Sequence, residues 1–578
     1  MHGVEHNPAS ARGNRASHIS GDRAAMVQHL NRLADLQELV TGDESGATLL
    51  RQWAVRVREI GDPARTIVTL DELDELEVEG REQYLLCMEA WFTGTTDRMK
   101  ELEQAVPDTL LPLLPLNGLG AKRLHLLWRE MGITDSSTLY HAATENRLQD
   151  VPGFGPKTQA KALSSLEALR RNQSRFLLHD LHPVADRLEK ELKGLLPADV
   201  RFDFVGEYRR RVLLSSGIDM IVDPDGYRAV LVHLVQTTDY ELLTASTQML
   251  QGRIRDTEIT ITFHFRGVNY HLEKFRLSGS PVHVDTIPVD EKRPYACESE
   301  IYEDAGLPWM APEIREGKEE IRLALSNRLP KLLRMEDMQG LFHAHSRYSD
   351  GSDTIANLAA AAQAMGMGYL GITDHGPGHD GRCLNLDSIA QQHREIDLLN
   401  QKMAPFRILK GVEAEIQPDG SLGMPEEVLS RFDFVIAALH APADISQADA
   451  TMRLVRAIRN PHTTMLGHLT SRMFLGPDGP PINVEAVLDA CLAHDVAIEV
   501  NCHPSRMDPD WKWLRVAANM GIRIAISPNA HSIAALSDYR VGVDIARKGL
   551  VSAAQTLNAL TMPELMRSLE LRKMRHLG

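Results

Sequence analysis

The clearest pattern of hydrophobic and polar positions lies in the second half of the chain, from residue 340 onwards. Short apolar runs such as YLGITDH (369–375) and VAIEVNCH (496–503) alternate with segments of helical periodicity such as 354–366 and 482–495. With residues 340–350 as the first, there are seven strand-like runs. Alternating strand and helix signals are typical of right-handed βαβ crossovers. The pattern therefore predicts an α/β domain whose parallel sheet closes into a barrel.

Metal-binding residue types stand at the end of these runs. The first run, GLFHAHSRYSD, carries His343 and His345, and Asp350 follows. On an extended strand, residues i and i+2 point to the same side, so we expect both imidazoles on one face. Loops at the carboxyl ends of parallel barrel strands build the active site, which indicates a metal centre there. The later runs contribute, in the same phase, His375, Glu413, Glu415, His440, His468, His503, Asn529 and His531.

In order and setting, these residues resemble the ligand pattern of the PHP (polymerase and histidinol phosphatase) family. The resemblance implies a seven-stranded distorted barrel over residues 338–578 that carries two or three divalent metal ions. The chain departs from the family at Asn529, where the family has aspartate. The ligands that the resemblance implies are His343, His345, Asp350, His375, Glu413, His440, His468, Asn529 and His531.

Further motifs bring the resemblance closer to the PHP domain of bacterial family X DNA polymerases. They include ITDHG at 372–376, GVEAEIQPDGSL at 411–422 and EVNCHPSRMD at 499–508. In that family the domain acts as a metal-dependent 3′–5′ exonuclease and phosphoesterase. The resemblance therefore implies a hydrolase that acts on DNA in DNA repair.

The N-terminal part of the chain is expected to be helical. Residues 1–23 are polar and lack a hydrophobic period, which is typical of a disordered leader. Residues 24–107 have helical periodicity and resemble the N-terminal domain of the family X polymerases. Leu86 stands where eukaryotic relatives have a lyase lysine, so no Schiff-base nucleophile is expected there.

Residues 108–175 contain two Gly-x-Gly turns between helix signals, a helix-hairpin-helix pattern. Glycines let such turns adopt positive φ and bring N–H groups close to a phosphate. Residues 118–175 hold nine Lys or Arg against five Asp or Glu in an otherwise acidic chain. The pattern predicts sequence-independent contact with the DNA backbone. The residues expected to make it are Gly118, Gly120, Lys122, Arg123, Gly153, Gly155 and Lys157.

Residues 176–330 resemble the palm of a family X nucleotidyltransferase followed by a truncated thumb. Three aspartates of that family hold two Mg²⁺ ions. Here Gly217 stands at the first position, Asp219 at the second and His271 at the third. One carboxylate cannot organise two magnesium ions, so we expect a degenerate palm. Two interpretations remain open for the arginines 209–211: a phosphate clamp or a solvated charge run.

Composition limits the class of protein without naming a substrate. The chain of 578 residues is too long for one ordinary domain. Its composition, 43% hydrophobic and 25% charged, is typical of a soluble multidomain protein. No apolar run is long enough to span a membrane, and a cytoplasmic location is expected. The five scattered cysteines predict reduced thiols rather than a disulfide framework. With a net charge of −16, DNA contact requires the local basic segment.

The leading hypothesis is a metal-dependent phosphoesterase whose ions activate water, with Glu413 shared between them and His343 and His345 at the reacting centre. Mixed nitrogen and oxygen ligands suit Mn²⁺ or Zn²⁺ better than Mg²⁺. Arg472 and Arg506 could bind the phosphate bidentately or form ordinary salt bridges, and the role of His503 stays open. Two alternatives remain: a DNA-directed DNA polymerase with a PHP exonuclease, and a DNA-binding protein without catalysis.

Overall fold

The structure of the chain is a computed structural model, and its described residues fall into two compact units. Unit 1 spans Met1–Arg171 and unit 2 spans Asn172–Gly578. Gly118, Gly153 and the predicted leader up to residue 22 lie outside the described residues. These residues are 23–60, 73, 81–93, 95–107, 109–114, 116, 119–144, 147–151, 154–171, 175–317, 319–378, 383–440, 445–474 and 479–577.

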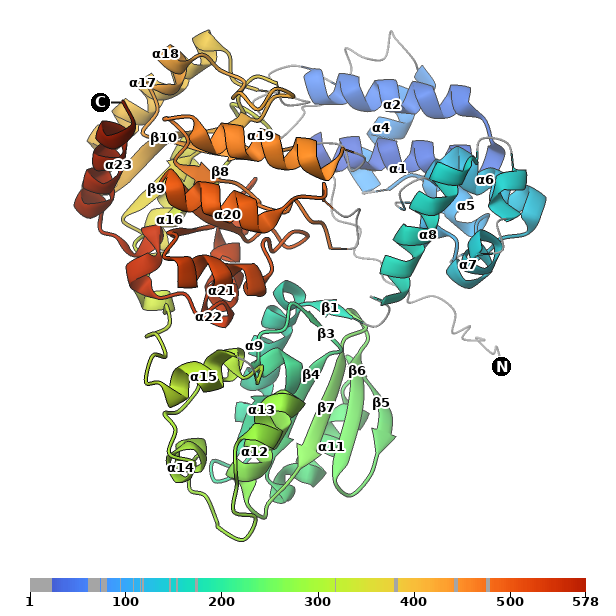
Figure 1. Cartoon of the computed structure of the whole chain (residues 1–578). Coiled ribbons are helices and arrows are strands. Elements are labelled where there is room, and N and C mark those ends of the chain that lie inside the picture. The colour runs from blue at the N-terminus through green and yellow to red at the C-terminus, as the bar shows by residue number, and fades with distance from the viewer. Residues whose placement is uncertain are drawn as a thin grey trace, which may run out of the picture. The chain divides into compact units, whose positions relative to one another are not determined.

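Unit 1 is helical, as predicted (Figure 1, blue to teal). Arg23, assigned to the leader from sequence, begins the first helix instead, because its guanidinium donates to the carbonyls of Val57, Arg58 and Ile60. Leu33 and Trp53 lie in one buried core, and Leu124 and Phe154 lie in a second. The helices are α1 (Arg23–Thr41), α2 (Glu44–Glu59), α4 (Arg81–Thr93), α5 (Asp97–Gln104), α6 (Gly120–Met131), α7 (Ser136–Thr144) and α8 (Pro156–Arg171).

The first part of unit 2 is a five-stranded sheet in the order β2-β4-β7-β6-β5, in which only β4 and β7 are parallel. Its strands are β2 (Phe202–Val205), β4 (Ile218–Val222), β5 (Tyr240–Ala245), β6 (Met249–Ile254) and β7 (Thr260–Phe265). Its helices are α9 (Leu178–Leu195), α10 (Gly206–Arg209), α11 (Tyr227–Gln236) and α12 (Tyr270–Ser278). We call these residues the palm. Three short helices follow: α13 (Pro281–Thr286), α14 (Glu298–Asp304) and α15 (Glu319–Leu325).

The second part of unit 2 is the predicted barrel of seven parallel strands. A parallel bridge between Ala344 and Ala530 brings the last strand's end beside the first, so the barrel is nearly closed. None of the described helices is long and apolar enough to span a membrane. The strands are β8 (Gly340–Ala344), β9 (Tyr369–Ile372), β10 (Arg407–Glu415), β11 (Phe434–Ala438), β12 (Met465–Leu466), β13 (Ala497–Asn501) and β14 (Ile524–Ser527).

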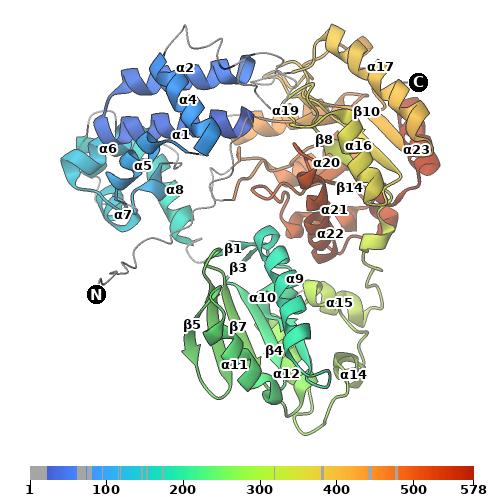
Figure 2. The same cartoon turned by 180° about the vertical axis from the view of Figure 1, so that it is seen from behind.

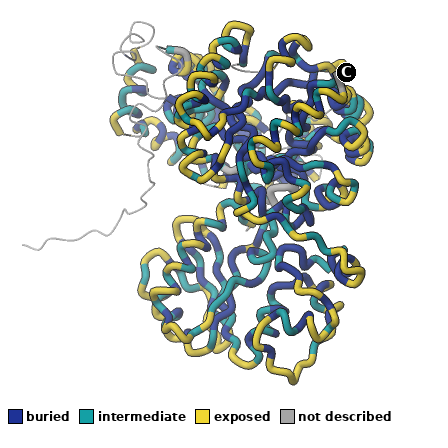
Figure 3. The backbone as a smooth tube through the Cα atoms, turned by 90° about the vertical axis from the view of Figure 1, so that its left-hand side faces the viewer, coloured by how far each residue is buried: buried dark blue, intermediate teal, exposed yellow. Residues whose placement is uncertain are grey.

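Helices cover the outside of this barrel, so nearly every strand residue is buried (Figures 2 and 3). Aromatic and branched side chains such as Phe342, Tyr369 and Phe434 fill its interior, and Leu565 and Leu569 of the last helix pack against them. The helices are α16 (Ile355–Ala364), α17 (Leu386–Met403), α18 (Glu426–Leu429), α19 (Gln447–Arg459), α20 (Val484–Ala493), α21 (Trp511–Met520), α22 (Tyr539–Lys548) and α23 (Met562–Leu577).

The first barrel strand is less regular than the sequence pattern predicts. Its register with β9 shifts between Leu341 and Ala344, and His343 has a φ of 59°. A bulge of this kind re-aims a side chain and adds local twist. His343 and His345 therefore lie on a bulged strand end. From the sequence we had expected a regular strand there.

The palm is attached to the barrel through buried ion pairs. Lys548, at the end of α22 and only 2% exposed, donates to the carbonyl oxygen of Arg210 at 3.1 Å and pairs with Glu316. The Asp544 carboxylate of the same helix pairs with His182 at 3.1 Å and with Arg211 at 3.4 Å. Unit 2 therefore packs as one body.

The arginines 209–211 do not match one of the two interpretations drawn from sequence, the solvated charge run. Arg209 pairs with Glu298 and donates to Ser278, Arg210 donates to the carbonyl of Ser278, and Arg211 pairs with Asp544. Their side chains are 30% exposed or less. Because each of these side chains contacts a group inside unit 2, the arginines join its parts and do not form a solvated charge run.

The pairing of Lys548 gives a prediction about stability. Removing the Lys548 ammonium costs about 1–3 kcal/mol, because the carbonyl oxygens of Arg210 and Glu313 lose their donor while Glu316 keeps Arg210 at 3.8 Å. We expect Lys548→Met to lower the free energy of unfolding of unit 2 by that amount in urea titrations. Lys193→Met, which breaks the exposed pair with Glu189, should cost about 0.3–0.5 kcal/mol and serves as the control. Equal effects of both changes would contradict the assignment.

Candidate metal centre

Three groups of side chains that could hold metal ions lie at the carboxyl ends of the barrel strands. Within each group, one ligand atom per residue lies within 4.8 Å of the others. Eight of the nine ligands predicted from sequence belong to them, and Asn529 contacts one member. The groups are His343, His345 and Glu413; Glu413, His440 and His468; and His345, Asp350, His375 and His531.

Glu413, at the end of β10, connects the first two groups. Its Oε2 lies 3.2 Å from His343 Nε2 and 3.4 Å from His345 Nε2. Its Oε1 lies 3.2 Å from His468 Nε2 and 3.9 Å from His440 Nε2. The two oxygens therefore face different groups, which is the geometry that a bridging carboxylate needs.

The third group lies on the open side of the centre. Asp350 Oδ2 is 3.3 Å from His531 Nε2 and 3.6 Å from His375 Nε2. The His345 and His531 rings stack at 4.3 Å between centroids, and the Asn529 side-chain oxygen lies 3.1 Å from His345 Nε2. Asp350 is 44% exposed, whereas His345 is fully buried. Access from solvent is therefore on the Asp350 side.

The electrostatics of the centre favour a bound cation. Burial opposes ionisation of Glu413, yet the charge of His343 and its hydrogen bond hold the pKa of this carboxyl well below its usual range. Burial opposes protonation of His343, yet Glu499 and Glu413 raise its pKa to about 10. Burial also holds the pKa of His345 well below its ordinary value. Buried carboxylates that raise the pKa of a neighbouring imidazole in this way also attract a metal cation.

The donor atoms fit a divalent metal ion. His343 Nε2 is buried, faces Glu413 and has no hydrogen-bond partner among the described residues. Such orphaned nitrogens are costly unless they bind something. Imidazole and carboxylate donors together match the ligand preferences of first-row divalent metals.

Three carboxylates that sequence reasoning did not assign hold the donors in place. Glu499 of β13 contacts His343, and Glu415 of β10 accepts from His440 Nδ1 at 2.6 Å. Asp374 is fully buried and accepts from the N–H and hydroxyl groups of Ser346 and Ser349, which fixes the loop before Asp350. The sequence pattern that could have identified these three carboxylates is an acidic residue inside or directly after an apolar strand run.

Arg472 forms a salt bridge, the second of the two roles considered for it from sequence. Its Nε donates to the carbonyl of Arg506 at 3.2 Å, a further nitrogen donates to Met507, and Nη1 pairs with Asp510 at 3.4 Å. These donors are therefore not free for a phosphate, and Arg472 orders the 506–510 loop. The guanidinium of Arg506 has no partner among the described residues, and its charge helps to lower the pKa of the largely desolvated His468.

His503, whose role was open, belongs to none of the three groups among the described residues. Its Nδ1 contacts the hydroxyl of Ser505 at 2.8 Å. Burial, and secondarily the charge of His531, lower its pKa to about 4. His503 is therefore a neutral residue beside the centre.

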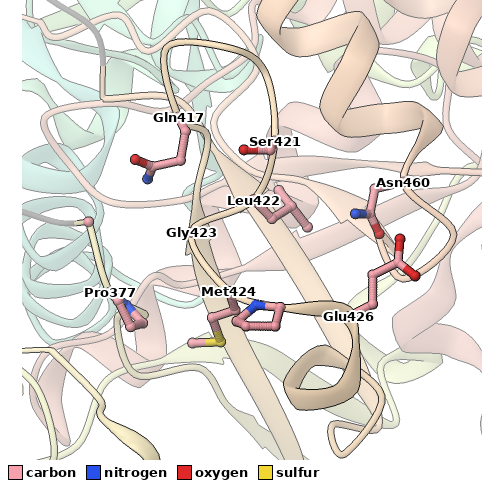
Figure 4. Close-up of a pocket in the computed structure, with 10 residues that line it drawn as sticks. Pro377, Gln417, Ser421, Leu422, Gly423, Met424, Glu426 and Asn460 are labelled. Carbon is pink, nitrogen blue, oxygen red and sulfur yellow. The ribbon is translucent and has the colours of Figure 1, made fainter.

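A cavity of about 570 Å³ lies near the loop that follows His375. Figure 4 shows Pro377 at one side and Glu426 and Asn460 at the other, with Gln417 and Leu422 on the hairpin after β10. The ideal Cβ of Gly378 would collide with the Gln417 amide, so a glycine is required where these loops meet.

The predicted DNA-contacting residues in unit 1 begin two helices. Gly120, with a φ of 53°, starts α6, and Lys122 and Arg123 lie in its first turn. Lys122 pairs with Glu44 of α2. Gly155 and Lys157 flank the start of α8. The two helix starts match the positions that the sequence pattern assigned to them.

The palm face lacks the carboxylates of a two-metal site. Gly217 has a φ of 146°, and a side chain there would collide with the carbonyl oxygen of Thr260. Asp219 pairs with His264 Nε2 at 3.1 Å. His271, the residue at the third carboxylate position, lies on α12 and not on β7, the strand beside Asp219. That strand ends at Phe265, and Thr262 is the residue opposite Asp219.

The fold and site define a PHP barrel protein, and residues 342–501 match the family model of the PHP domain. The chain is 29% identical over 523 residues to the DNA polymerase/3'-5' exonuclease PolX of Bacillus subtilis, covering 86% of this chain and 91% of that protein. It is 30% identical over 200 residues to a probable phosphatase of Caldicellulosiruptor saccharolyticus, covering 33% of this chain and 78% of that protein. The chain therefore carries a C-terminal PHP domain and is similar over most of its length to a bacterial family X DNA polymerase.

The donor geometry gives a prediction about metal content. We expect the purified protein to carry at least about two equivalents of transition metal, because two groups share Glu413 and a third adjoins them. His343→Ala with His345→Ala removes donors from two groups and should remove most of this metal, measured by inductively coupled plasma mass spectrometry.

The matched control is His264→Ala with His271→Ala in the palm, which should leave the metal content unchanged. Metal retained at wild-type levels in the barrel double variant would contradict the assignment of the centre.

Proposed function

We propose that the barrel is a metal-dependent phosphoesterase with 3′–5′ exonuclease activity on DNA, and that it serves DNA repair. The observation that carries this proposal is the pair of donor groups that share the Glu413 carboxylate. Two ions held a few ångströms apart are a recurrent arrangement for phosphate ester hydrolysis. The relation to an exonuclease and to probable phosphatases agrees with this chemistry.

Each part of the centre has a distinct task in this proposal. Divalent ions bound there supply Lewis acidity toward water and phosphate. Glu413 would hold ions through its two oxygens, together with the buried imidazoles of His343, His345 and His468 and the more exposed imidazole of His440. Asp350, His375, Asn529 and His531 form the open side, where substrate enters.

Arg506 is the proposed phosphate contact. It lies on the loop that Arg472 orders, and its charge is felt by His440 and His468. A guanidinium suits a phosphate oxygen pair geometrically. Glu413 is the proposed bridging ligand, so no serine or cysteine nucleophile is required.

Mn²⁺ or Zn²⁺ are the proposed ions, two or three in number. The donors are mostly imidazole nitrogens, which suit these metals better than Mg²⁺ with its preference for oxygen ligands. Asn529 offers an uncharged oxygen beside His345 and completes the third group without adding negative charge.

DNA is the proposed polymer substrate. The Gly120 and Gly155 turns present Lys122, Arg123 and Lys157 at two helix starts, where N–H groups and positive charge favour phosphates. These contacts are independent of sequence, as an enzyme that trims diverse DNA ends requires.

Loss of polymerase activity is also proposed. The palm has Asp219 as the remaining carboxylate of the expected three, and its oxygen is paired with His264. The backbone around Gly217 leaves no room for an acidic side chain. Nucleotidyl transfer requires carboxylates that hold two magnesium ions, so this face cannot support it.

The hydrolysis proposal predicts the effect of Glu413→Gln. Removing the shared negative charge should lower Mn²⁺-dependent hydrolysis by at least about 100-fold, since such ions supply several kcal/mol of transition-state stabilisation. The measurements are release of nucleotides from 3′-labelled DNA and cleavage of bis-p-nitrophenyl phosphate.

Glu241→Gln, in an exposed pair with Arg253, is the control and should retain wild-type rates. Hydrolysis by Glu413→Gln at the control's rate would rule out the shared-carboxylate centre.

The polymerase proposal predicts that a primed template is not extended. With all four nucleotides and Mg²⁺ or Mn²⁺, product should stay at background, measured on denaturing gels with Glu413→Gln protein so that exonuclease does not mask synthesis. Extension that Asp219→Ala abolishes would show an active palm and contradict the proposal.

A further inference from the structure

A second buried carboxylate lies behind the metal centre and belongs to none of its donor groups. Glu499, in β13, is fully buried. One of its oxygens contacts His343 Nδ1. The other accepts from the backbone N–H of His468 at 2.7 Å and from the Asn501 amide at 3.0 Å. Glu499 therefore contacts a member of each of the two groups that share Glu413.

The contact with His343 determines which ring nitrogen faces the centre. An imidazole that binds a metal ion is neutral and keeps one N–H, so a hydrogen bond from Nδ1 to Glu499 would leave the lone pair on Nε2. Nε2 of His343 lies 3.2 Å from Glu413 Oε2 and has no hydrogen-bond partner among the described residues. Carboxylates in this position orient metal-binding histidines and strengthen their donation.

The contact with His468 acts on the backbone. His343 has a φ of 59° and His468 a φ of 23°, conformations that residues other than glycine rarely adopt. Such conformations persist only where surrounding contacts impose them. Glu499 contacts both residues, so one side chain supports two strained positions on opposite sides of Glu413.

We propose that Glu499 is a positioning residue that fixes the Nε2-donating form of His343 and couples it to the backbone of His468. Resting on the proposed metal-dependent function, the inference is that affinity at both groups depends on this one side chain. Glu415 differs, because it accepts from the side chain and the N–H of His440 alone. Glu413 thus contacts both groups through its two oxygens, and Glu499 contacts both through His343 Nδ1 and the backbone N–H of His468.

The test compares Glu499→Gln with Glu415→Gln in the full-length protein. Loss of a carboxylate that supports a metal ligand lowers metal affinity by about 10–100-fold. We expect Glu499→Gln to weaken two equivalents of Mn²⁺ or Zn²⁺ in competition titrations with a chelator, and Glu415→Gln to weaken one. The visible spectrum of the Co²⁺-loaded protein should change in both variants, which a loss of packing alone would not produce.

Glu320→Gln is the matched control for folding. Glu320 is also fully buried and contacts a histidine, His283, at 3.1 Å, but it lies in α15 outside the donor groups. This variant should have a lower melting temperature with unchanged metal affinity and Co²⁺ spectrum. If Glu499→Gln does not fold, Asn501→Ala removes one donor to Glu499 and should give a smaller loss of the same two equivalents.

The outcomes separate this inference from the proposed function. Wild-type protein that binds no transition metal would overturn both. Wild-type metal binding with unchanged affinities in Glu499→Gln, or a loss confined to one equivalent, would overturn the role of Glu499 alone.

Discussion

Burial of the Glu413 carboxylate is the constraint on which the barrel's chemistry depends. A buried charge is costly unless it is paired. Five histidines place a ring nitrogen within 3.9 Å of its oxygens: His343, His345, His375, His440 and His468. They come from the ends of β8, β9, β11 and β12, which lie on either side of β10 in the sheet, so the cluster forms only when these strands pair. Closure rests on the bridge between Ala344 and Ala530, directly beside the donors.

Three carboxylates outside the donor groups hold the metal centre in an ordered arrangement. Asp374 holds the loop before Asp350, Glu415 holds His440, and Glu499 holds His343. Glu415 and Glu499 lie in strands of otherwise apolar residues and contact a histidine, whereas Asp374 follows β9 and contacts two serines. The positive φ values at His343, His468 and Asn529 indicate that tertiary contacts, rather than local preference, determine the backbone there.

The palm illustrates the opposite use of charge. Asp219 pairs with His264, Glu207 with Arg175 and Arg209 with Glu298. These charged groups of the palm therefore form ion pairs within unit 2. Lys548, Asp544 and Arg547 of α22 extend these contacts from the barrel. Because α22 follows the strand end that carries Asn529 and His531, the palm stabilises the part of the barrel that leads away from the metal centre.

The sequence by itself determined the seven barrel strands, the helices between them and the residues that gather at the strand ends, because period and residue type are local properties. It also indicated that the palm lacks a carboxylate at position 217, where Gly217 stands. Only the tertiary structure decided that His343 lies on a bulge, that Arg472 is bound to the 506–510 loop and that His271 lies on a helix away from Asp219. Glu499 likewise became a partner of His343 only through folding. Hydrogen bonds between residues 156 positions apart depend on strand register and barrel closure, which hydrophobic periodicity does not encode.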